Sequence, residues 1–485
     1  MIRLLALSLV VVALSVYAWR DWYKALCGLI LLIAVVEHPD MPKTIFGVQG
    51  LNLWNMLLSV VLLAWLSSRR REGLAWDMPK HVAGLILVYL GVVLVGFLRM
   101  LANRAGLEGE TTGFLVSEYL INTVKWVIPG LLLYDGCRSR KRFILGLGAL
   151  TGVYFLLALQ VIRWMPIETA FSGDSLSARS LKILANEVGF HRVNLAMMLA
   201  GASWAILTTL PLARRWTTAM TISGAGVATI YALALTAGRT GYMAWAVVGL
   251  ALGVLRWRRC LVIVPLVAML GPWAVPGVLD RLGQGFEDEV TDVYTVTAGR
   301  NVAWPLVLDK IAEAPLTGYG RRAMERTGLA VQLRDEFDED FAHPHNAYME
   351  MLLDNGWIGL LLVAPFYLTI LGIAVRLLRD QRSSYFVVAG AVTTTLILAL
   401  LVASVGSQTF YPREGAVPMW CAIGLVLRVA VVRARVSART RRTSLDPWFA
   451  PAASSWRVGR NGPRPAGQIR PPKVVAGRGE EVPES

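Results

Sequence analysis

The sequence is poor in charged residues and in cysteine for its length. Only 17% of its 485 residues are Asp, Glu, Lys or Arg, whereas about 25% is usual in soluble globular proteins. The four cysteines, Cys27, Cys137, Cys260 and Cys421, form no CxxC or Cys/His spacing, so the sequence predicts neither a metal site nor a disulfide framework. No small-residue cleavage site follows the first apolar segment, and we therefore expect no cleavable signal peptide.

Long apolar segments dominate the chain instead. Hydrophobic residues make up 55% of it and occur in segments of roughly twenty, separated by short polar stretches, as in membrane-spanning helices. We therefore expect an all-α polytopic transmembrane bundle of 12–13 spans, because the first two segments are short and could form one broken element. The expected spans are residues 2–19, 22–36, 50–66, 81–98, 118–134, 143–162, 193–210, 217–236, 241–256, 260–276, 347–375, 385–404 and 416–432.

Basic residues gather in every second loop of this arrangement, for example in 69–71, 138–142 and 376–382. The positive-inside rule makes these loops cytoplasmic, so the long polar loop 277–346 is expected in the periplasm. Residues 433–485 are rich in Arg, Pro, Ser and Gly, and we expect them to form a basic, disordered, cytoplasmic tail. The net charge of +15 lies largely in these loops and the tail, which favours contact with membrane lipids and no nucleic-acid partner.

Two arginines on the expected periplasmic side are candidate anion ligands. Arg239 lies in the turn 236–241 between two apolar segments, where small neighbours let a guanidinium reach an anionic group at the membrane surface. Ordinary snorkelling is the alternative for this residue. Arg300 lies in the long loop, where a surface ion pair is the alternative. The residues from Lys310 onward predict an amphipathic helix that ends in the Pro/Gly turn 315–320.

The segment that follows this loop carries a candidate base. Pro344 suits the first turn of a helix, so we expect His345 in that turn, where the helix dipole and a nearby cation lower the pKa of the imidazole and keep it neutral. His343 and His345 could also form a weak metal site, but no matching carboxylate/His spacing supports one. His343, Asn346 and Tyr348 are further candidates for substrate binding.

Two more basic residues are weaker candidates. Lys125 interrupts an expected span, and an ionisable group at that depth usually faces a cavity or a partner. Either attraction of a phosphate or pairing with Glu118 accounts for it. Arg192, beside His191, is a candidate for contact with a glycan or a phosphate.

Taken together, these features resemble the O-antigen ligase and polymerase superfamily, also called the Wzy C-terminal family. The resemblance covers about residues 190–370 and departs from the family pattern at Thr240, where a second small residue is common. The segments that carry it are Gly189–Ala196, Ala237–Gly241, Gly299–Arg300 with Trp304, Pro315–Gly320, His345–Tyr348, and Leu352–Leu353 with Gly356–Leu360.

The resemblance implies a GT-C-like fold and a metal-independent inverting glycosyltransferase of the bacterial inner membrane, without a cofactor. Its donor is a glycan on undecaprenyl pyrophosphate, and its acceptor is lipid A core, a protein or a growing glycan. By motif, Arg239 and Arg300 would hold the pyrophosphate, and His345 would be the general base, with the loop 277–346 as a lid. The implied organisation is N-terminal transmembrane helices in 1–190, an O-antigen ligase-like core in 191–432, and the tail 433–485.

Other functions remain open at this point. A Wzy-type polysaccharide polymerase needs the same leaving-group site as a ligase, and the sequence does not display the acceptor contacts that separate them. A small-solute transporter would suit many helices and a buried Lys125. However, the spans show no internal repeat and no paired Gly/Pro-broken segments.

Overall fold

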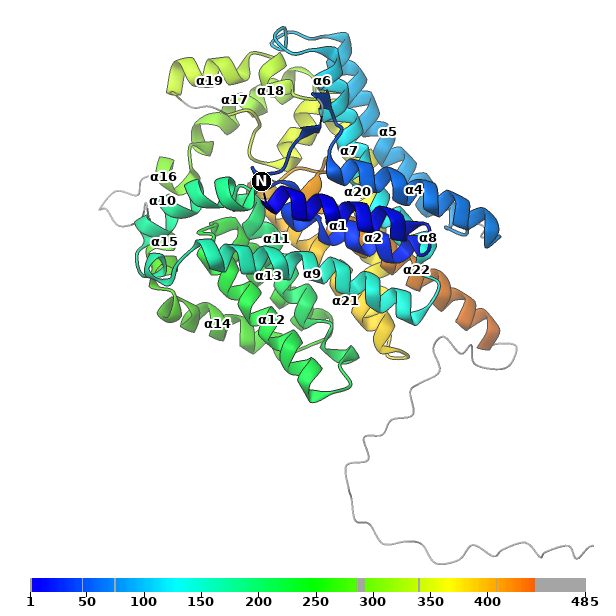
Figure 1. Ribbon diagram of the computed structural model, residues 1–485. Helices are drawn as coiled ribbons and strands as arrows, with labels where there is room; N and C mark the ends of the chain where they lie inside the picture. Colours follow the sequence, from blue (N-terminus) through cyan, green and yellow to red (C-terminus); the bar gives the residue numbers. More distant parts are fainter. Residues whose placement is uncertain are drawn as a thin grey trace, which may run out of the picture.

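The computed structural model describes residues 2–440 except 46, 74–75, 285, 287–292, 339–340 and 407. Within this part the chain is helical apart from one antiparallel hairpin of β1 (Thr44–Ile45) and β2 (Val48–Gln49). The all-α class is therefore confirmed (Figure 1). Most of the expected tail, from residue 441 onward, lies outside the described residues, whereas residues 433–440 continue the last helix.

The helices of the N-terminal part include one π-helix, η1. In order they are α1 (Ile2–Ala18), α2 (Trp22–Leu31), α3 (Ile33–Val36), α4 (Leu53–Arg71), α5 (Lys80–Ala102), α6 (Thr112–Val116), η1 (Ser117–Ile121), α7 (Asn122–Lys125), α8 (Ile128–Gly136) and α9 (Arg140–Trp164). Side chains of Asp21, Asn52, Thr111 and Ser139 accept backbone hydrogen bonds at the starts of α2, α4, α6 and α9, as N-cap residues do.

The central part of the chain contains η2 (Ile167–Phe171), α10 (Gly173–Ile183), η3 (Leu184–Val188), α11 (Arg192–Leu207), η4 (Leu210–Leu212), α12 (Trp216–Leu235), α13 (Arg239–Leu255), α14 (Cys260–Ala274) and α15 (Pro276–Gly283). The remainder contains α16 (Val293–Thr297), α17 (Arg300–Glu313), α18 (Ala323–Arg326), α19 (Leu329–Phe337), α20 (Ala347–Leu378), α21 (Ser384–Ala403), η5 (Ser404–Gly406), η6 (Glu414–Ala416) and α22 (Val417–Thr440).

Seven described helices are long and apolar enough to cross a membrane, or eight if the bent pair α14–α15 forms one span. This is fewer than the 12–13 spans expected. Several apolar segments are broken: the segment 118–134 divides into η1, α7 and α8, and α14 bends by 91° into α15. Helices α1, α2 and α13 have 17, 10 and 17 residues, and about 20 are needed to span the hydrocarbon core without help.

Helices α11, α21 and α22 form the centre of the bundle and are buried along most of their length. Helices α5, α12, α14 and α20 lie around them and expose large apolar side chains, such as Leu87, Val227, Met269 and Leu361. An outer surface of this kind fits contact with lipid chains. Three of the four cysteines, Cys27, Cys137 and Cys421, are buried free thiols, as small apolar residues would be.

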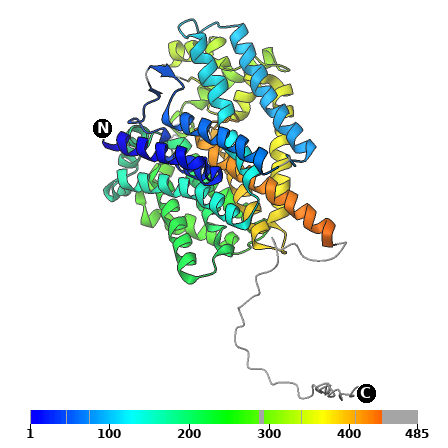
Figure 2. The same ribbon diagram turned by 45° about the vertical axis from the view of Figure 1, so that its right-hand side comes forward.

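The bundle has two distinct ends (Figures 1 and 2). One end, here called the loop end, carries α10 and α15–α19. The opposite end, here called the basic end, carries residues 69–80, 138–142, 376–382 and 433–435. Contacts join the segments of the basic end: Arg433 binds Asp380 at 2.5 Å, and Arg140 lies over the Tyr385 ring at 5.3 Å. The loops expected to share a side of the membrane therefore lie on the same end of the molecule.

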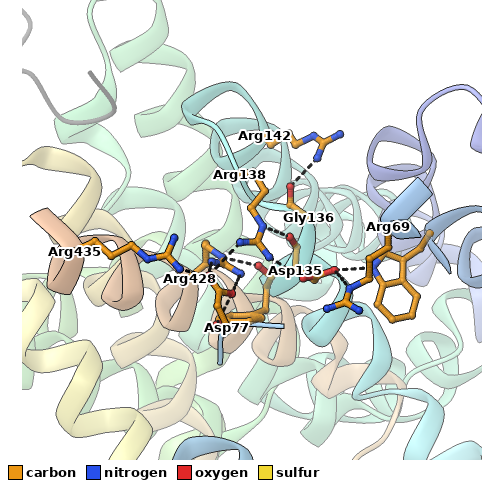
Figure 3. A network of polar contacts seen from close by, with 10 residues as sticks. Arg69, Asp77, Asp135, Gly136, Arg138, Arg142, Arg428 and Arg435 are labelled. Atoms are coloured by element: carbon orange, nitrogen blue, oxygen red, sulfur yellow. Dashed lines mark hydrogen bonds and ion pairs between the residues drawn. The ribbon is translucent and has the colours of Figure 1, made fainter. Parts of the chain in front are cut away.

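Two carboxylates hold the basic end together (Figure 3). Asp135, fully buried at the end of α8, accepts hydrogen bonds from Arg69 at 3.0 Å and Arg138 at 2.8 Å. Asp77, in the segment between α4 and α5, binds the buried Arg428 of α22 at 2.7 Å. Further donors to these two carboxylates come from Trp65, Tyr134 and Arg435. The network ties α4, α8 and α22 to one another.

Candidate active site

Arg239 begins α13 and extends its guanidinium toward the backbone of the long loop. Its Nε, Nη1 and Nη2 atoms donate to the carbonyl oxygens of Arg281, Val296 and Gln284 at 3.0, 3.2 and 2.7 Å. The preceding turn places Ala237 at a φ of 53°, a conformation that few non-glycine residues adopt. The turn therefore determines where α13 starts and hence where the Arg239 side chain is placed.

Two further arginines surround this turn. Arg281 of α15 donates from Nε to the carbonyl oxygen of Ala237 at 3.5 Å, and the positive charges of Arg192 and Arg239 both act on it. Arg192 begins α11 and donates from Nη1 to the hydroxyl of Ser177 at 2.8 Å. The three guanidiniums thus form a positively charged cluster at the loop end.

Arg300 joins the long loop to the membrane core. It begins α17 after Gly299, whose φ of 74° suits glycine, and its Nη2 donates to the carbonyl oxygen of Gly406 at 3.0 Å. A Cβ atom on Gly406 would collide with the side chain of Thr240, the neighbour of Arg239, so Gly406 links the two predicted arginine motifs. The Nε atom of Arg300 is buried and has no hydrogen-bond partner within the described part of the chain.

His345 lies at the same end, in the segment that leads into α20. Its ring packs at right angles to that of His343, with centroids 4.3 Å apart, and against Phe341 at 5.0 Å. Burial, as the main cause, and the neighbouring His343, Arg300 and His191 together lower the pKa of His345 to about 3. The imidazole is therefore neutral at physiological pH and can accept a proton.

One prediction about His345 was wrong. The helix begins at Ala347, so His345 lies outside the first turn rather than in it, and its φ of 52° is not helical. The reason is Asn346, whose side chain accepts hydrogen bonds from the backbone N–H groups of Tyr348 and Met349 at 3.0 and 3.2 Å and so caps the helix. Burial and neighbouring positive charges lower the imidazole pKa here, and no helical turn encloses the ring.

The loop helix α17 also positions the backbone beside His345. The Nε1 atom of Trp304 donates to the carbonyl oxygen of Pro344 at 3.0 Å. Arg300 and Trp304 therefore connect one helix to both the Gly406 turn and the histidine segment. The helix spans Arg300–Glu313 and so starts ten residues before the amphipathic helix predicted from Lys310.

A second contact fixes the long loop to α20. Gly356, at φ 64° and ψ −170°, breaks this helix, and the segment 315–320 lies against the break. Gly356 must lack a side chain because a Cβ atom there would collide with the backbone of Leu316 and Thr317. The four backbone hydrogen bonds join Trp357 N to Pro315 O (2.8 Å), Ile358 N to Leu316 O (3.1 Å), Tyr319 N to Leu353 O (2.8 Å) and Gly320 N to Asp354 O (2.6 Å).

The remaining candidates lie in different environments. The Tyr348 hydroxyl donates to the carbonyl oxygen of Leu401 at 2.9 Å, so it contacts α21. Lys125 is 8% exposed and lines a separate cavity of the loop end. Its pairing with Glu118 is not seen: the Glu118 carboxylate accepts a hydrogen bond from Asn122 at 2.7 Å.

Sequence reasoning missed two arginines of this region. Arg281 belongs to the guanidinium cluster, and Arg413 donates to the side-chain oxygens of Asn194 and Gln408 at 2.5 and 2.6 Å. Within the described ranges, no group of three or more His, Cys, Asp or Glu side chains is arranged to hold a metal ion.

Comparison with known families identifies the segment that contains these features. The family model described as O-antigen ligase (Wzy_C) matches residues 224–364. This range includes Arg239, Arg281, Arg300 and His345 and leaves out Arg192 and Lys125. No curated protein matches the chain.

Proposed function

We propose that this membrane protein with an O-antigen ligase domain transfers a glycan from a polyprenyl-pyrophosphate donor to an acceptor hydroxyl at the periplasmic membrane surface. The observation that carries the proposal is the meeting of a neutral histidine with arginines at one end of the bundle. His345, Arg300 and Arg239 come from separate segments, and the Gly406 turn and α17 connect them.

The arginines are suited to the leaving group. As the donor's bond from the anomeric carbon to the phosphate oxygen breaks, negative charge builds on the pyrophosphate, and guanidiniums stabilise it through charge-assisted hydrogen bonds. The buried Nε of Arg300 has a free donor position for such an oxygen. Arg281 and Arg192 add positive charge to the same region, so we propose them as additional ligands beside Arg239.

His345 is suited to the nucleophile. The acceptor oxygen forms the new bond to the anomeric carbon, its proton passes to the imidazole, and the pyrophosphate leaves from the opposite face, which inverts the anomeric configuration. An imidazole with a pKa of about 3 is a weak base, but the bound pyrophosphate would raise that pKa by offsetting the charge of Arg300. The base would therefore become effective when the donor is bound.

The orientation follows from charge. Short basic loops favour the cytoplasm, and the contacts at the basic end support the grouping of these loops on one side. We propose that the basic end is cytoplasmic and that the loop end faces the periplasm of a bacterial inner membrane. The core 191–432, the N-terminal helices 1–190 and the tail 433–485 are proposed as its three parts.

Deletion of the gene tests the reaction class, with surface glycans examined by gel and lectin blot. Accumulation of long lipid-linked polymer would support a ligase, which is our proposal. Accumulation of single lipid-linked repeats would instead identify a polymerase. Unchanged surface glycans in the deletion strain would contradict both.

A further inference from the structure

The loop end contains a cavity of about 490 Å³ that none of the proposed catalytic residues lines. Its walls come from the 37–44 segment and the starts of α4 and η1, together with Lys125, Trp126 and Glu414. Its volume lies within the range of about 300–1,000 Å³ that is usual for small-molecule sites. All of its lining residues lie outside the matched range 224–364.

From its lining and position, we infer that this cavity is the subsite for the acceptor glycan, a reading that rests on the proposed function. Trp54 and Trp126 form its aromatic wall, with ring centroids 4.7 Å apart and planes tilted by 49°. The Nε1 atom of Trp54 donates to the carbonyl oxygen of Leu29 at 3.1 Å, which fixes this ring. Aromatic faces of this kind pack against the C–H face of a sugar ring, as they do against other apolar surfaces.

The polar side chains of the cavity fit hydroxyl groups. Lys125 is 8% exposed, and its ammonium lies 4.2 Å from the Trp126 ring centre. Within the described residues it forms no hydrogen bond or ion pair and lies over the Trp54 and Trp126 rings, so its N–H donors have no oxygen acceptor. The Oδ1 atom of Asn55 is also buried without a partner in that part of the chain. Sugar hydroxyls both donate and accept, and would satisfy these two groups together.

The charge of the cavity argues against a phosphate as its occupant. Three carboxylates, Glu37, Glu118 and Glu414, line it against two ammonium groups, those of Lys43 and Lys125. All three carboxylates act electrostatically on Lys125. Because burial raises the pKa of Glu37 to about 7, the cavity carries little net charge, and a pyrophosphate would be attracted to the arginine cluster instead. The occupant is therefore a glycan segment without phosphate.

The position of the cavity favours the acceptor over the donor. Tyr119 lines both this cavity and a smaller one of about 170 Å³, whose walls include His343 and Pro344. Arg239, Arg300 and His345 line neither cavity, but the ring of His343 packs against that of His345. A glycan bound beside Lys125 therefore approaches the reaction from the side of the proposed base. In an inverting displacement the acceptor arrives from that side and the pyrophosphate departs from the other.

A kinetic test uses the full-length protein in membranes of the deletion strain, supplied with lipid-linked donor and with acceptor extracted from that strain. We expect Trp126→Ala and Lys125→Met to raise the KM for the acceptor about tenfold and to leave the KM for the donor unchanged. Trp273→Ala, on the exposed surface of α14, is the matched control and should alter neither. An increase in the KM for the donor, or no change in either, overturns the assignment.

Photocrosslinking tests occupancy directly and does not depend on turnover. The photoreactive amino acid p-benzoylphenylalanine replaces Phe114 in the cavity wall or, as a control, the exposed Phe171 at the same end. We expect a glycan-stained adduct from position 114 and none from position 171. The inference is contradicted if position 114 gives no adduct, or if the adduct at 114 contains only protein and does not stain for glycan. Neither result bears on the proposed reaction, because that reaction is tested by the glycans of the deletion strain.

Discussion

The two ends of the bundle both concentrate arginine, but they provide it with different partners. At the basic end, Arg69 and Arg138 bind the carboxylate of Asp135, and Arg428 binds that of Asp77. Each of these guanidiniums lies against a carboxylate that it shares with another arginine, so its charge is partly offset. An arginine in such a pair joins helices and is not available to a ligand.

At the loop end, Arg322 also forms ion pairs, with Glu110 and Glu325, but the arginines of the proposed site have neutral partners. Arg300 and Arg192 donate to the backbone carbonyl oxygens of Gly406 and Ser177. Arg281 donates to the carbonyl oxygen of Ala237 and to the side-chain amide oxygen of Gln284. None of these three forms an ion pair within the described ranges. A carbonyl oxygen orients a guanidinium without cancelling its charge, so this end keeps a positive potential that an anionic leaving group can use. The predictions below separate these two uses of arginine.

The largest effect is expected at His345. We expect His345→Asn to reduce kcat by about 10²–10⁴-fold, the usual contribution of a general base. Asn is the matched substitution because it tolerates the positive φ of this position better than most residues, so the fold should persist. The measurement is transfer of lipid-linked glycan in membranes, with gel filtration of the purified variant. Retention of wild-type kcat would remove His345 from the mechanism.

The second largest loss of turnover is expected at Arg300. We expect Arg300→Gln to lower turnover by about 10²–10³-fold, as loss of one electrostatic donor does, with little change in thermal stability. Arg138→Gln, in the network of Figure 3, is the contrasting variant: it should lower stability and leave the turnover of folded molecules unchanged. If both variants lost only stability, the distinction between the two ends would fail.

Asp135→Asn should affect stability alone. Asp135 is fully buried, whereas the side chains of Arg69 and Arg138 are each 25% exposed and Arg138 also binds Asp77. We therefore expect a loss of stability smaller than the roughly 3–5 kcal/mol that breaking a fully buried ion pair costs. We expect a lower unfolding temperature in detergent, followed by tryptophan fluorescence. The initial rate per folded molecule should equal that of the wild type, and a rate loss greater than the loss of folded protein would count against a purely structural role.

The smallest effect concerns pH. Because burial lowers the folded-state pKa of His345 to about 3, the unfolded chain binds its proton first as pH falls below about 6.5. The free energy of unfolding therefore decreases as the pH falls from about 6.5 to about 3, and the decrease should be smaller in His345→Asn. Unfolding temperatures measured at pH 7, 5.5 and 4.5 check this. His191 has a pKa lowered by burial and is present in both proteins, so a difference between them reports on position 345.

The sequence predicted the helical class and the segments that meet at the loop end, because hydrophobic patterns and the family motifs are local. It did not predict the breaks. The interruption of the segment 118–134 and the kink at Gly356 depend on contacts with distant parts of the chain, such as the packing of residues 315–320 on α20. Arg281 and Arg413 were missed for the same reason, since their proximity to Arg239 and Asn194 arises only on folding.

The cavity beside Lys125 shows the same limit. A lone lysine in an apolar segment indicated either a phosphate ligand or an ion pair with Glu118. The structure instead surrounds it with two tryptophans and three carboxylates from separate segments. Periodicity gives no information on such a grouping because its members lie up to 377 positions apart, from Glu37 to Glu414.

The break in α20 also has a consequence for how the protein is made. Four backbone groups of this helix, which an unbroken helix would pair internally, are bonded to residues 315–320. Unpaired backbone groups are costly away from water. The helix can therefore reach its final state only after residues 315–320 have docked on it. Docking of the loop and completion of α20 are thus coupled steps of folding, and a loop that docks late would leave the helix incomplete.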